Sequence, residues 1–242
     1  DNSQAGAGVA LKVIDSRVGR NYGWAPGVIR NEGVLNGFGG AATGSGAIGG
    51  NGYGVNVINS QIGTIDFRNP PSTVSGGINN LGSIQGVGGS VSGASVAAGS
   101  GYGISLANNS QVFGLTNSGF IHAIGGSALG SGSSGGNAYG VSLASSTIAG
   151  TLLNTGVIRG AGGNVDGYLA GAGGGYGIVA SGNSQIYGIT NTGSISGFGG
   201  AGLNASGGNN GYGVSFANST ITGSLQNSGV IQGLGGNAAV SG

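Results

Sequence analysis

The segment Asn117-Ser118-Gly119-Phe120-Ile121-His122-Ala123-Ile124-Gly125-Gly126 is one of six copies of the phrase Asn-x-Gly-x-(Ile/Leu)-x-(Gly/Ala)-x-Gly-Gly. The asparagines that open the copies are 49, 37, 37, 37 and 36 residues apart and are Asn31, Asn80, Asn117, Asn154, Asn191 and Asn227. A period of this length is typical of repeat proteins, in which each unit buries its apolar residues against its neighbours. The chain is therefore predicted to form a stack of repeats.

The second to sixth repeats have a (Gly/Ala)-Tyr-Gly segment before the phrase, and a Gly/Ser/Ala-rich segment follows the phrase in each repeat. The first repeat lacks the tyrosine and alone contains Trp24 and Pro26, and the second has an insertion with Pro70 and Pro71. We expect one domain over residues 1–242, with repeat units at approximately 7–51, 52–100, 101–137, 138–174, 175–210 and 211–242.

Apolar residues alternate with small or polar ones in short segments, which is the signature of strands with one buried face. Tyr102, Ile104 and Leu106 are predicted to share such a face, while Ile158 faces the core and Arg159 faces away from it. No segment has helical spacing, and glycine is too frequent for helices. The chain is predicted to be all-β.

The predicted fold is a right-handed parallel β-helix, or β-solenoid, of about six stacked units. About 25 residues with three short strands would form one turn, and successive turns would lie ~4.8 Å apart. The Gly/Ser-rich segments, such as 127–137 and 201–210, are expected to be loops that leave the coil at one corner and line up on one side. Two coils per repeat remain an alternative. A bundle of polyglycine helices is less favoured, because glycine has no three-residue period.

Stacked repeats would bring equivalent side chains together. The six asparagines are predicted to form a ladder in which each amide bonds to the next. The tyrosines would form a parallel aromatic column of Tyr53, Tyr102, Tyr139, Tyr176 and Tyr212. Both columns are interpreted as structural rather than as ligand-binding.

Composition excludes several classes of protein. Of 242 residues, 63 are glycine, 11 are charged and none is cysteine, and the net charge is +1. This charge predicts no attraction for nucleic acid. No apolar run is long enough to cross a membrane, and the polar start suggests no signal peptide. The absence of cysteine excludes disulfides and thiolate metal sites.

No catalytic, cofactor-binding or metal-binding residues are predicted, and the protein is not expected to be an enzyme. The only histidine, His122, occupies a polar position and is expected at the surface. The carboxylates are not paired for acid-base chemistry, no base activates a serine, and the Gly-x-Gly phrases lack a following helix. Seven charges lie in the first 32 residues, as a polar end or a contact surface: Asp1, Lys12, Asp15, Arg17, Arg20, Arg30 and Glu32.

The phrases Asn191-Thr192-Gly193-Ser194-Ile195-Ser196-Gly197 and Ser219-Thr220-Ile221-Thr222-Gly223-Ser224-Leu225-Gln226-Asn227-Ser228-Gly229 resemble repeats of bacterial autotransporter passenger domains and haemagglutinin-like surface adhesins. The resemblance extends from about residue 8 to residue 236. It implies a right-handed β-helix outside a Gram-negative cell, with a role in adhesion, aggregation or biofilm structure. No carboxyl-terminal membrane barrel is present, which departs from that pattern.

These observations predict an extracellular structural or adhesive protein. Because solenoid ends need caps and none is evident, we expect the chain to stack head to tail into a fibre or to belong to a longer adhesin. The alternative is a ligand-binding solenoid that recognises surface glycans or ice. Ice binding is disfavoured because the threonines do not hold one position in every unit: Thr116, Thr151, Thr155, Thr190, Thr192, Thr220 and Thr222.

Overall fold

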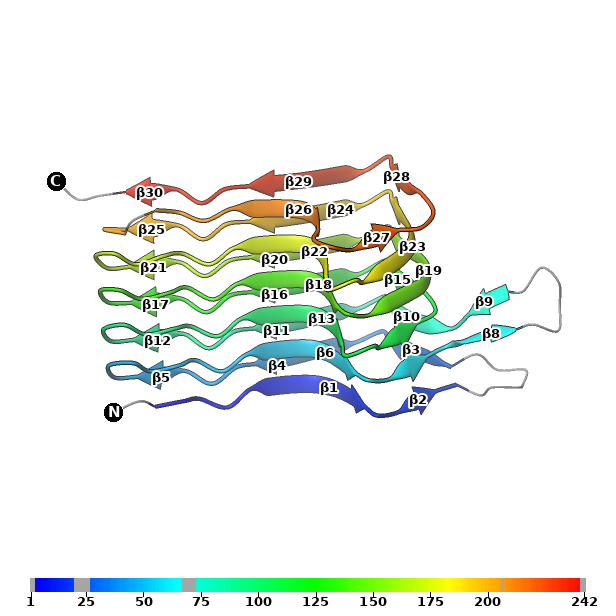
Figure 1. The fold of residues 1–242 in the computed structure, drawn as a ribbon, viewed down its shortest axis with the longest axis horizontal. Helices are drawn as coiled ribbons and strands as arrows, with labels where there is room; N and C mark the ends of the chain where they lie inside the picture. The colour runs from blue at the N-terminus through cyan, green and yellow to red at the C-terminus, as the bar shows by residue number, and fades with distance from the viewer. Residues whose placement is uncertain (1–2, 20–26, 67–72, 206, 240–242) are drawn as a thin grey trace.

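The computed structural model describes residues 3–19, 27–66, 73–205 and 207–239, and the chain forms an all-β, parallel stacked β-solenoid (Figure 1). No helix occurs in these ranges. Trp24, Pro26, Pro70 and Pro71, which distinguish the first two repeats, lie outside the described residues, as do Asp1 and Arg20.

Sheet 1 contains the Gly-Tyr-Gly segments. Its six strands are, in order, β1 (Gly8–Ile14), β6 (Gly52–Ile58), β13 (Gly101–Ala107), β18 (Ala138–Ala144), β22 (Gly175–Ser181) and β26 (Gly211–Phe216). Equivalent positions pair directly, for example Tyr102 with Tyr139. Residues 37 apart in sequence are thus neighbours, so one repeat makes one coil and the alternative of two coils per repeat is excluded. The coil is also longer than the predicted 25-residue turn.

Sheet 2 follows at the next side of each coil and has ten strands. One row begins with β2 (Arg17–Val18), β7 (Gln61–Ile62) and β14 (Gln111–Val112), and the other with β3 (Val28–Asn31), β10 (Gly77–Asn80) and β15 (Leu115–Asn117). The two rows merge in β19 (Thr147–Asn154) and β23 (Gln185–Asn191), and they separate again as β27 (Thr220–Ile221) and β28 (Leu225–Asn227).

Sheets 3 and 4 complete the coil, and all pairings between coils are parallel. Sheet 3 contains β4 (Val34–Phe38), β11 (Ser83–Val87), β16 (Phe120–Ile124), β20 (Val157–Ala161), β24 (Ser194–Phe198) and β29 (Val230–Leu234). Sheet 4 contains β5 (Ala42–Thr43), β12 (Val91–Ser92), β17 (Ala128–Leu129), β21 (Val165–Asp166), β25 (Gly202–Leu203) and β30 (Ala238–Ala239). An antiparallel hairpin, β8 (Thr64–Asp66) and β9 (Thr73–Ser75), projects from the second coil.

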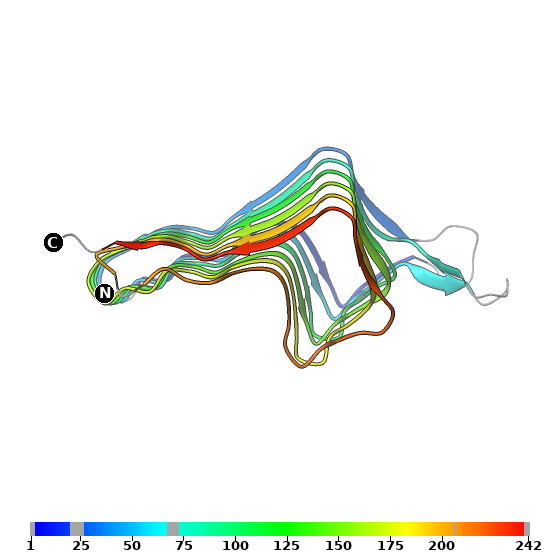
Figure 2. The ribbon, with the colours of Figure 1, turned by 90° about the horizontal axis from the view of Figure 1, so that it is seen from above.

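Seen from above, the solenoid has a triangular head and a long thin arm (Figure 2). Sheets 1, 2 and 3 enclose the main core in the head, where the side chains of Ile104, Ile121 and Leu152 are fully buried. A smaller core of alanines and valines lies in the arm, around Ala47, Val91 and Ala128. Sheet 4 forms the far end of the arm (Figure 1).

The Gly/Ser-rich segments lie on one side of the stack, but they are not loops that leave the coil. Each runs out to sheet 4 and returns, and backbone hydrogen bonds cross between the outgoing and returning layers. Gly89 N donates to Gly50 O (2.8 Å), Gly99 N donates to Gly89 O (2.9 Å), and Gly126 N donates to Gly99 O (2.9 Å). The interpretation of these segments as loops that leave the coil is therefore wrong.

Only glycine permits this spacing of the two layers. A Cβ atom added at Gly88 would lie 1.8 Å from Gly99 O, and one at Gly99 would lie 1.9 Å from Gly50 O. Main-chain atoms therefore occupy the space that side chains fill in an ordinary two-layer structure. The repeated Gly-Gly of the sequence phrase is explained by this contact.

Candidate functional site

The asparagine side chains form a continuous column at the corner between sheets 2 and 3. Each Nδ2 donates to the Oδ1 of the asparagine in the next coil, over 2.8, 2.7, 2.8, 2.7 and 2.7 Å, along the order Asn31, Asn80, Asn117, Asn154, Asn191 and Asn227. The four middle residues are fully buried. Buried amides of this kind are stable only when they are hydrogen-bonded.

The column has a direction, because every bond runs from a coil to the next one toward the C-terminus. Asn227 Nδ2, at the upper end, donates only to Gly229 O at 3.2 Å. At the lower end, none of the described residues donates to Asn31 Oδ1. One end of the ladder thus presents a donor and the other presents an acceptor.

The tyrosines form a stacked column beside sheet 1. Their ring centroids are 4.7, 5.0, 5.1 and 5.4 Å apart from Tyr53 through Tyr102, Tyr139 and Tyr176 to Tyr212. Burial raises the pKa of Tyr102 to about 12, and the charges of Tyr139 and Tyr53 add to the shift. Burial is also the main cause of the raised pKa values of Tyr139 and Tyr176.

The prediction that Tyr102 shares the core face with Ile104 and Leu106 is wrong. Ile104 and Leu106 belong to the main core, whereas neither core cluster includes Tyr102. A Cβ atom on Gly103 would lie 2.5 Å from Ile121 Cγ2, so Gly103 itself faces the core. Gly103 and Ile104 are successive inward positions, and this break in alternation turns the tyrosine outward.

A second column of polar side chains, not predicted from the sequence, lies at the corner between sheets 1 and 2. This serine ladder has two hydrogen-bonded parts, Ser16 to Ser110 and Ser146 to Ser219, and within each part a backbone N–H donates to the Oγ of the serine in the next coil. The backbone N of Ser146 donates to Ser184 Oγ (3.1 Å), and Ser184 Oγ donates to Ser181 O (2.6 Å). A Ser/Asn/Asp-Ser dipeptide recurs at every such corner, and this signal was hidden among the many other serines.

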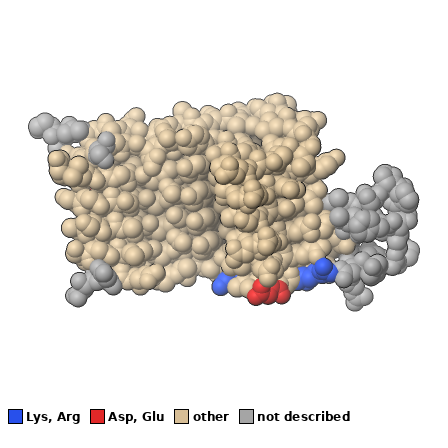
Figure 3. Space-filling model, in the orientation of Figure 1, with Lys and Arg blue, Asp and Glu red and all other residues tan. Residues whose placement is uncertain are grey.

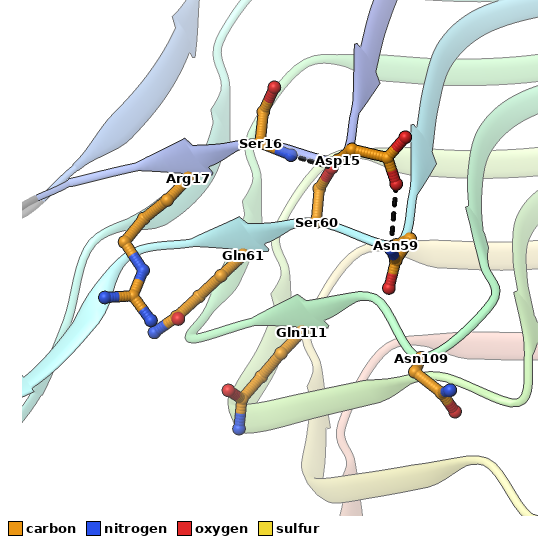
Figure 4. Close-up of a pocket in the computed structure, with 8 residues that line it drawn as sticks. All are labelled: Asp15, Ser16, Arg17, Asn59, Ser60, Gln61, Asn109 and Gln111. Atoms are coloured by element: carbon orange, nitrogen blue, oxygen red, sulfur yellow. Dashed lines mark hydrogen bonds between the residues drawn. The ribbon is translucent and has the colours of Figure 1, made fainter.

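A polar groove of about 410 Å³ lies outside the same corner in the first three coils (Figure 4). Its lining is Asp15, Ser16, Arg17, Asn59, Ser60, Gln61, Asn109 and Gln111. Asn59 Nδ2 donates to Asp15 Oδ1 at 2.8 Å. Among the described residues, none forms a hydrogen bond with the side-chain amides of Gln61, Asn109 or Gln111. The groove therefore presents free donors and acceptors to solvent.

His122 was expected at the surface, but its ring is partly buried in sheet 3. It pairs with Gln85 on one side and with Arg159 on the other. Its Nε2 atom is buried and has no hydrogen-bond partner. Burial lowers the pKa of His122, and the positive charge of Arg159 lowers it further. No carboxylate pairs with it across the sheet.

Charged side chains gather at the edge formed by the first coil, and the other described residues on the visible face are uncharged (Figure 3). Lys12, Asp15 and Arg17 belong to β1, β2 and the corner between them. Arg30 and Glu32 form an ion pair with each other. Both side chains of that pair are largely exposed, so the pair contributes little to stability.

The outer face of sheet 3 carries two mainly apolar columns with a polar column between them. The apolar members of the outer columns are Val34, Phe38, Val87, Phe120, Ile124, Val157, Ala161, Phe198, Val230 and Leu234, and the polar column between them is Asn36, Gln85, His122, Arg159, Ser196 and Gln232. Val34 is 66% exposed and Phe120 is 60% exposed. Arg159 lies over the Phe198 ring, with Cζ 4.4 Å from the ring centroid. The exposed apolar side chains therefore form two stripes rather than one contiguous patch.

Within the described ranges, no three His, Cys, Asp or Glu side chains converge on a position where they could hold a metal ion. The same ranges contain no helix that could span a membrane.

The comparisons with protein-family models, curated proteins and solved structures found no match for this chain.

Proposed function

We propose that this protein is an extracellular structural or adhesive β-solenoid at the surface of a Gram-negative bacterium. In this proposal the solenoid is right-handed, has six repeat units, and continues head to tail. What continues it is either a second copy or the neighbouring repeats of a longer adhesin. Biofilm structure, cell adhesion and aggregation are the roles that such an assembly would serve.

The observation that carries the proposal is the directed asparagine ladder. Its upper end presents the Asn227 amide and its lower end presents Asn31 Oδ1, so a second solenoid placed above the first would extend the ladder without a change of direction. The backbone supports the same extension, because β1 and β29 are edge strands of parallel sheets. Open edges of this kind favour pairing with further strands. A contact between unlike ends does not close, so it propagates.

Two further features support a structural or adhesive role. Backbone hydrogen bonds join successive coils in every sheet and across the arm, which favours resistance to proteases because cleavage requires local opening. The two apolar stripes on the outer face of sheet 3 would supply exposed apolar side chains for lateral contact between solenoids or with another surface. No threonine column accompanies these features, because Thr116 and Thr190 alternate with Leu153 in one row, so no observation favours ice binding.

Electron microscopy of the purified chain at neutral pH tests the head-to-tail contact. We expect unbranched filaments with an axial repeat of one chain. The variant Leu225→Asp places a charge on the upper edge and should prevent filament growth. Leu169→Asp, at an exposed position in the turn at the end of the arm, is the control and should leave filaments intact.

Adhesion is tested by displaying the chain on cells and measuring aggregation and attachment, and localisation by antibody labelling of intact source cells. Isolated rods at high concentration, together with displayed chains that cause neither aggregation nor attachment, would contradict the proposal. Isolated rods with clear adhesion would favour the longer-adhesin form over the fibre.

A further inference from the structure

We propose that the groove at the corner between sheets 1 and 2 binds an uncharged, hydroxyl-rich ligand, namely a short segment of a neutral oligosaccharide. This inference concerns binding by the side of the solenoid and does not depend on head-to-tail assembly.

The fold builds the groove from a three-residue pattern that repeats in successive coils. Asp15, Asn59 and Asn109 each have a left-handed backbone, with φ of 45°, 45° and 62°. Asparagine and aspartate tolerate this conformation better than other residues with a Cβ. The chain turns there, and the next residue, a serine, points into the corner and joins the serine ladder. The residue after the serine then points outward again.

Two outward rows result, and the groove lies between them (Figure 4). One row is Asp15, Asn59 and Asn109, and the other is Arg17, Gln61 and Gln111. The second row is set by strand pairing, because Gln61 pairs with both Arg17 and Gln111. Neighbouring members of a row are therefore about 4.8 Å apart, so each row spans roughly 10 Å. This length suits a short oligosaccharide segment rather than a single ion.

The chemistry of the lining selects hydroxyl groups. A carboxamide carries two donors and an acceptor with two lone pairs, so it can engage a hydroxyl group in either sense. Asn59, Asn109, Gln61 and Gln111 provide four carboxamides around one groove. The amides of Gln61, Asn109 and Gln111 have no partner among the described residues, and a ligand could therefore use them without breaking existing bonds.

The charges of the lining argue against other ligand classes. Asp15 and Arg17 have opposite signs and lie on opposite sides of the lower end of the groove, so the groove has no net charge (Figure 4). An anionic ligand would meet the Asp15 carboxylate, and a cation would meet the Arg17 guanidinium. No apolar side chain lines the groove, which removes the basis for binding a lipid or another apolar molecule.

The groove ends at the fourth coil, because the sequence has shorter side chains there. In the fourth coil the two outward positions are Ser145 and Thr147, whose side chains are shorter than Asn and Gln. The amide pattern returns only at Asn183 and Gln185, one coil further along. Gln185 therefore lies in the same column as Gln61 and Gln111 but outside the groove.

The test measures binding of defined probes to the purified chain by saturation-transfer NMR and calorimetry. The neutral probes are maltohexaose, cellohexaose and mannohexaose, and the charged probes are a heparin hexasaccharide and inorganic phosphate. We expect at least one neutral oligosaccharide to bind and the charged probes not to bind. In the double variant Gln61→Ala/Gln111→Ala, the affinity should fall by about tenfold or more, as expected for the loss of a few hydrogen bonds.

Gln185→Ala is the matched control and should bind as the unmodified chain does. Circular dichroism of each variant verifies that the solenoid is intact. The proposal is overturned if no neutral probe binds at millimolar concentration, or if Gln185→Ala weakens binding as much as the double variant does. Binding of heparin or phosphate that Arg17→Gln abolishes would also overturn it, since the groove would then be an anion site.

Discussion

Asn117 Nδ2 donates a hydrogen bond of 2.8 Å to Asn154 Oδ1, although the two residues are 37 positions apart in the chain. Both side chains are fully buried, so each amide hydrogen-bonds to the other amide instead of to water. Asn117 Nδ2 also lies 3.2 Å from Gly119 O and 3.1 Å from Val157 O, so one amide links the turns of two coils. The corner is therefore held by a network rather than by isolated bonds.

Removing one member of this network should be costly. Asn117→Ala leaves the buried Asn154 Oδ1 without its donor and removes one of the acceptors of Asn80 Nδ2, which keeps Gly82 O and Phe120 O. We expect a loss of about 3 kcal/mol in the free energy of unfolding, measured by urea denaturation. Asn227→Ala, at the exposed end, should cost less than about 1 kcal/mol. Equal losses for the two variants would show that the buried ladder has no special role.

The serine ladder should behave in the same way on a smaller scale. Ser184→Ala deprives the buried Ser146 N–H of its acceptor, and a loss of about 1–2 kcal/mol in stability is expected. Ser16→Ala is the control, because Ser16 is exposed and its Oγ only donates to Ile14 O. Urea denaturation of both variants provides the comparison, and a destabilisation by Ser16→Ala that matches Ser184→Ala would count against the ladder.

Two glycine-to-alanine substitutions in the arm are expected to differ strongly in their effect on stability. Gly99→Ala introduces a Cβ atom 1.9 Å from Gly50 O, so the two layers of the arm must separate. We expect a destabilisation of about 1–3 kcal/mol and faster hydrogen exchange of the arm amides than of the head amides. Gly171→Ala meets no atom within 4 Å and should be nearly neutral. Unchanged exchange in Gly99→Ala would mean that the layers are not in contact.

Tyrosine ionisation should limit stability at high pH. The pKa of Tyr102 is raised from 10.0 to about 12, so the folded state holds this proton more tightly than the unfolded state does. The stabilisation of the folded state that this difference in pKa provides is complete below pH 10 and is lost as the pH rises from 10 toward 12. Urea midpoints measured across this range should fall less steeply for Tyr102→Phe than for the unmodified chain. Parallel curves for the two proteins would contradict the assigned cause.

His122 offers a titration without overlap, because it is the only histidine in the chain. Its pKa is lowered from 6.5, first by burial and then by Arg159, so the neutral ring is favoured in the fold. Stability from this group is present above pH 6.5 and is lost as the pH falls below that value toward the folded pKa. NMR titration should give a pKa below 6.5 that rises in Arg159→Gln but stays below 6.5, because this variant removes the nearby charge and leaves the ring buried. A normal pKa in the unmodified chain would overturn this account.

The asparagine column could be predicted because its cause is local and repeated. Asn117 and Asn154 occupy the same position of one phrase, so stacking alone brings them together. The serine ladder has an equally regular signal in pairs such as Asn59-Ser60 and Asn183-Ser184, but serine is common throughout the chain. The groove could not be predicted, because Asp15 and Gln111 are 96 positions apart and only the register of three coils makes them neighbours.

By itself, the sequence determined that the chain is all-β and that its repeats stack. It also determined that equivalent asparagines and tyrosines align, because repeats of about 37 residues place the same residue type at the same position of each coil. Only the tertiary structure decided the path of the Gly/Ser-rich segments, the side on which Tyr102 lies, and the burial of His122. The physical reason is that glycine has no side chain, so a glycine-rich segment has no pattern of apolar residues from which its path could be predicted. Its contribution is made by main-chain contacts, such as that between Gly99 and Gly50, which exist only when the two layers meet.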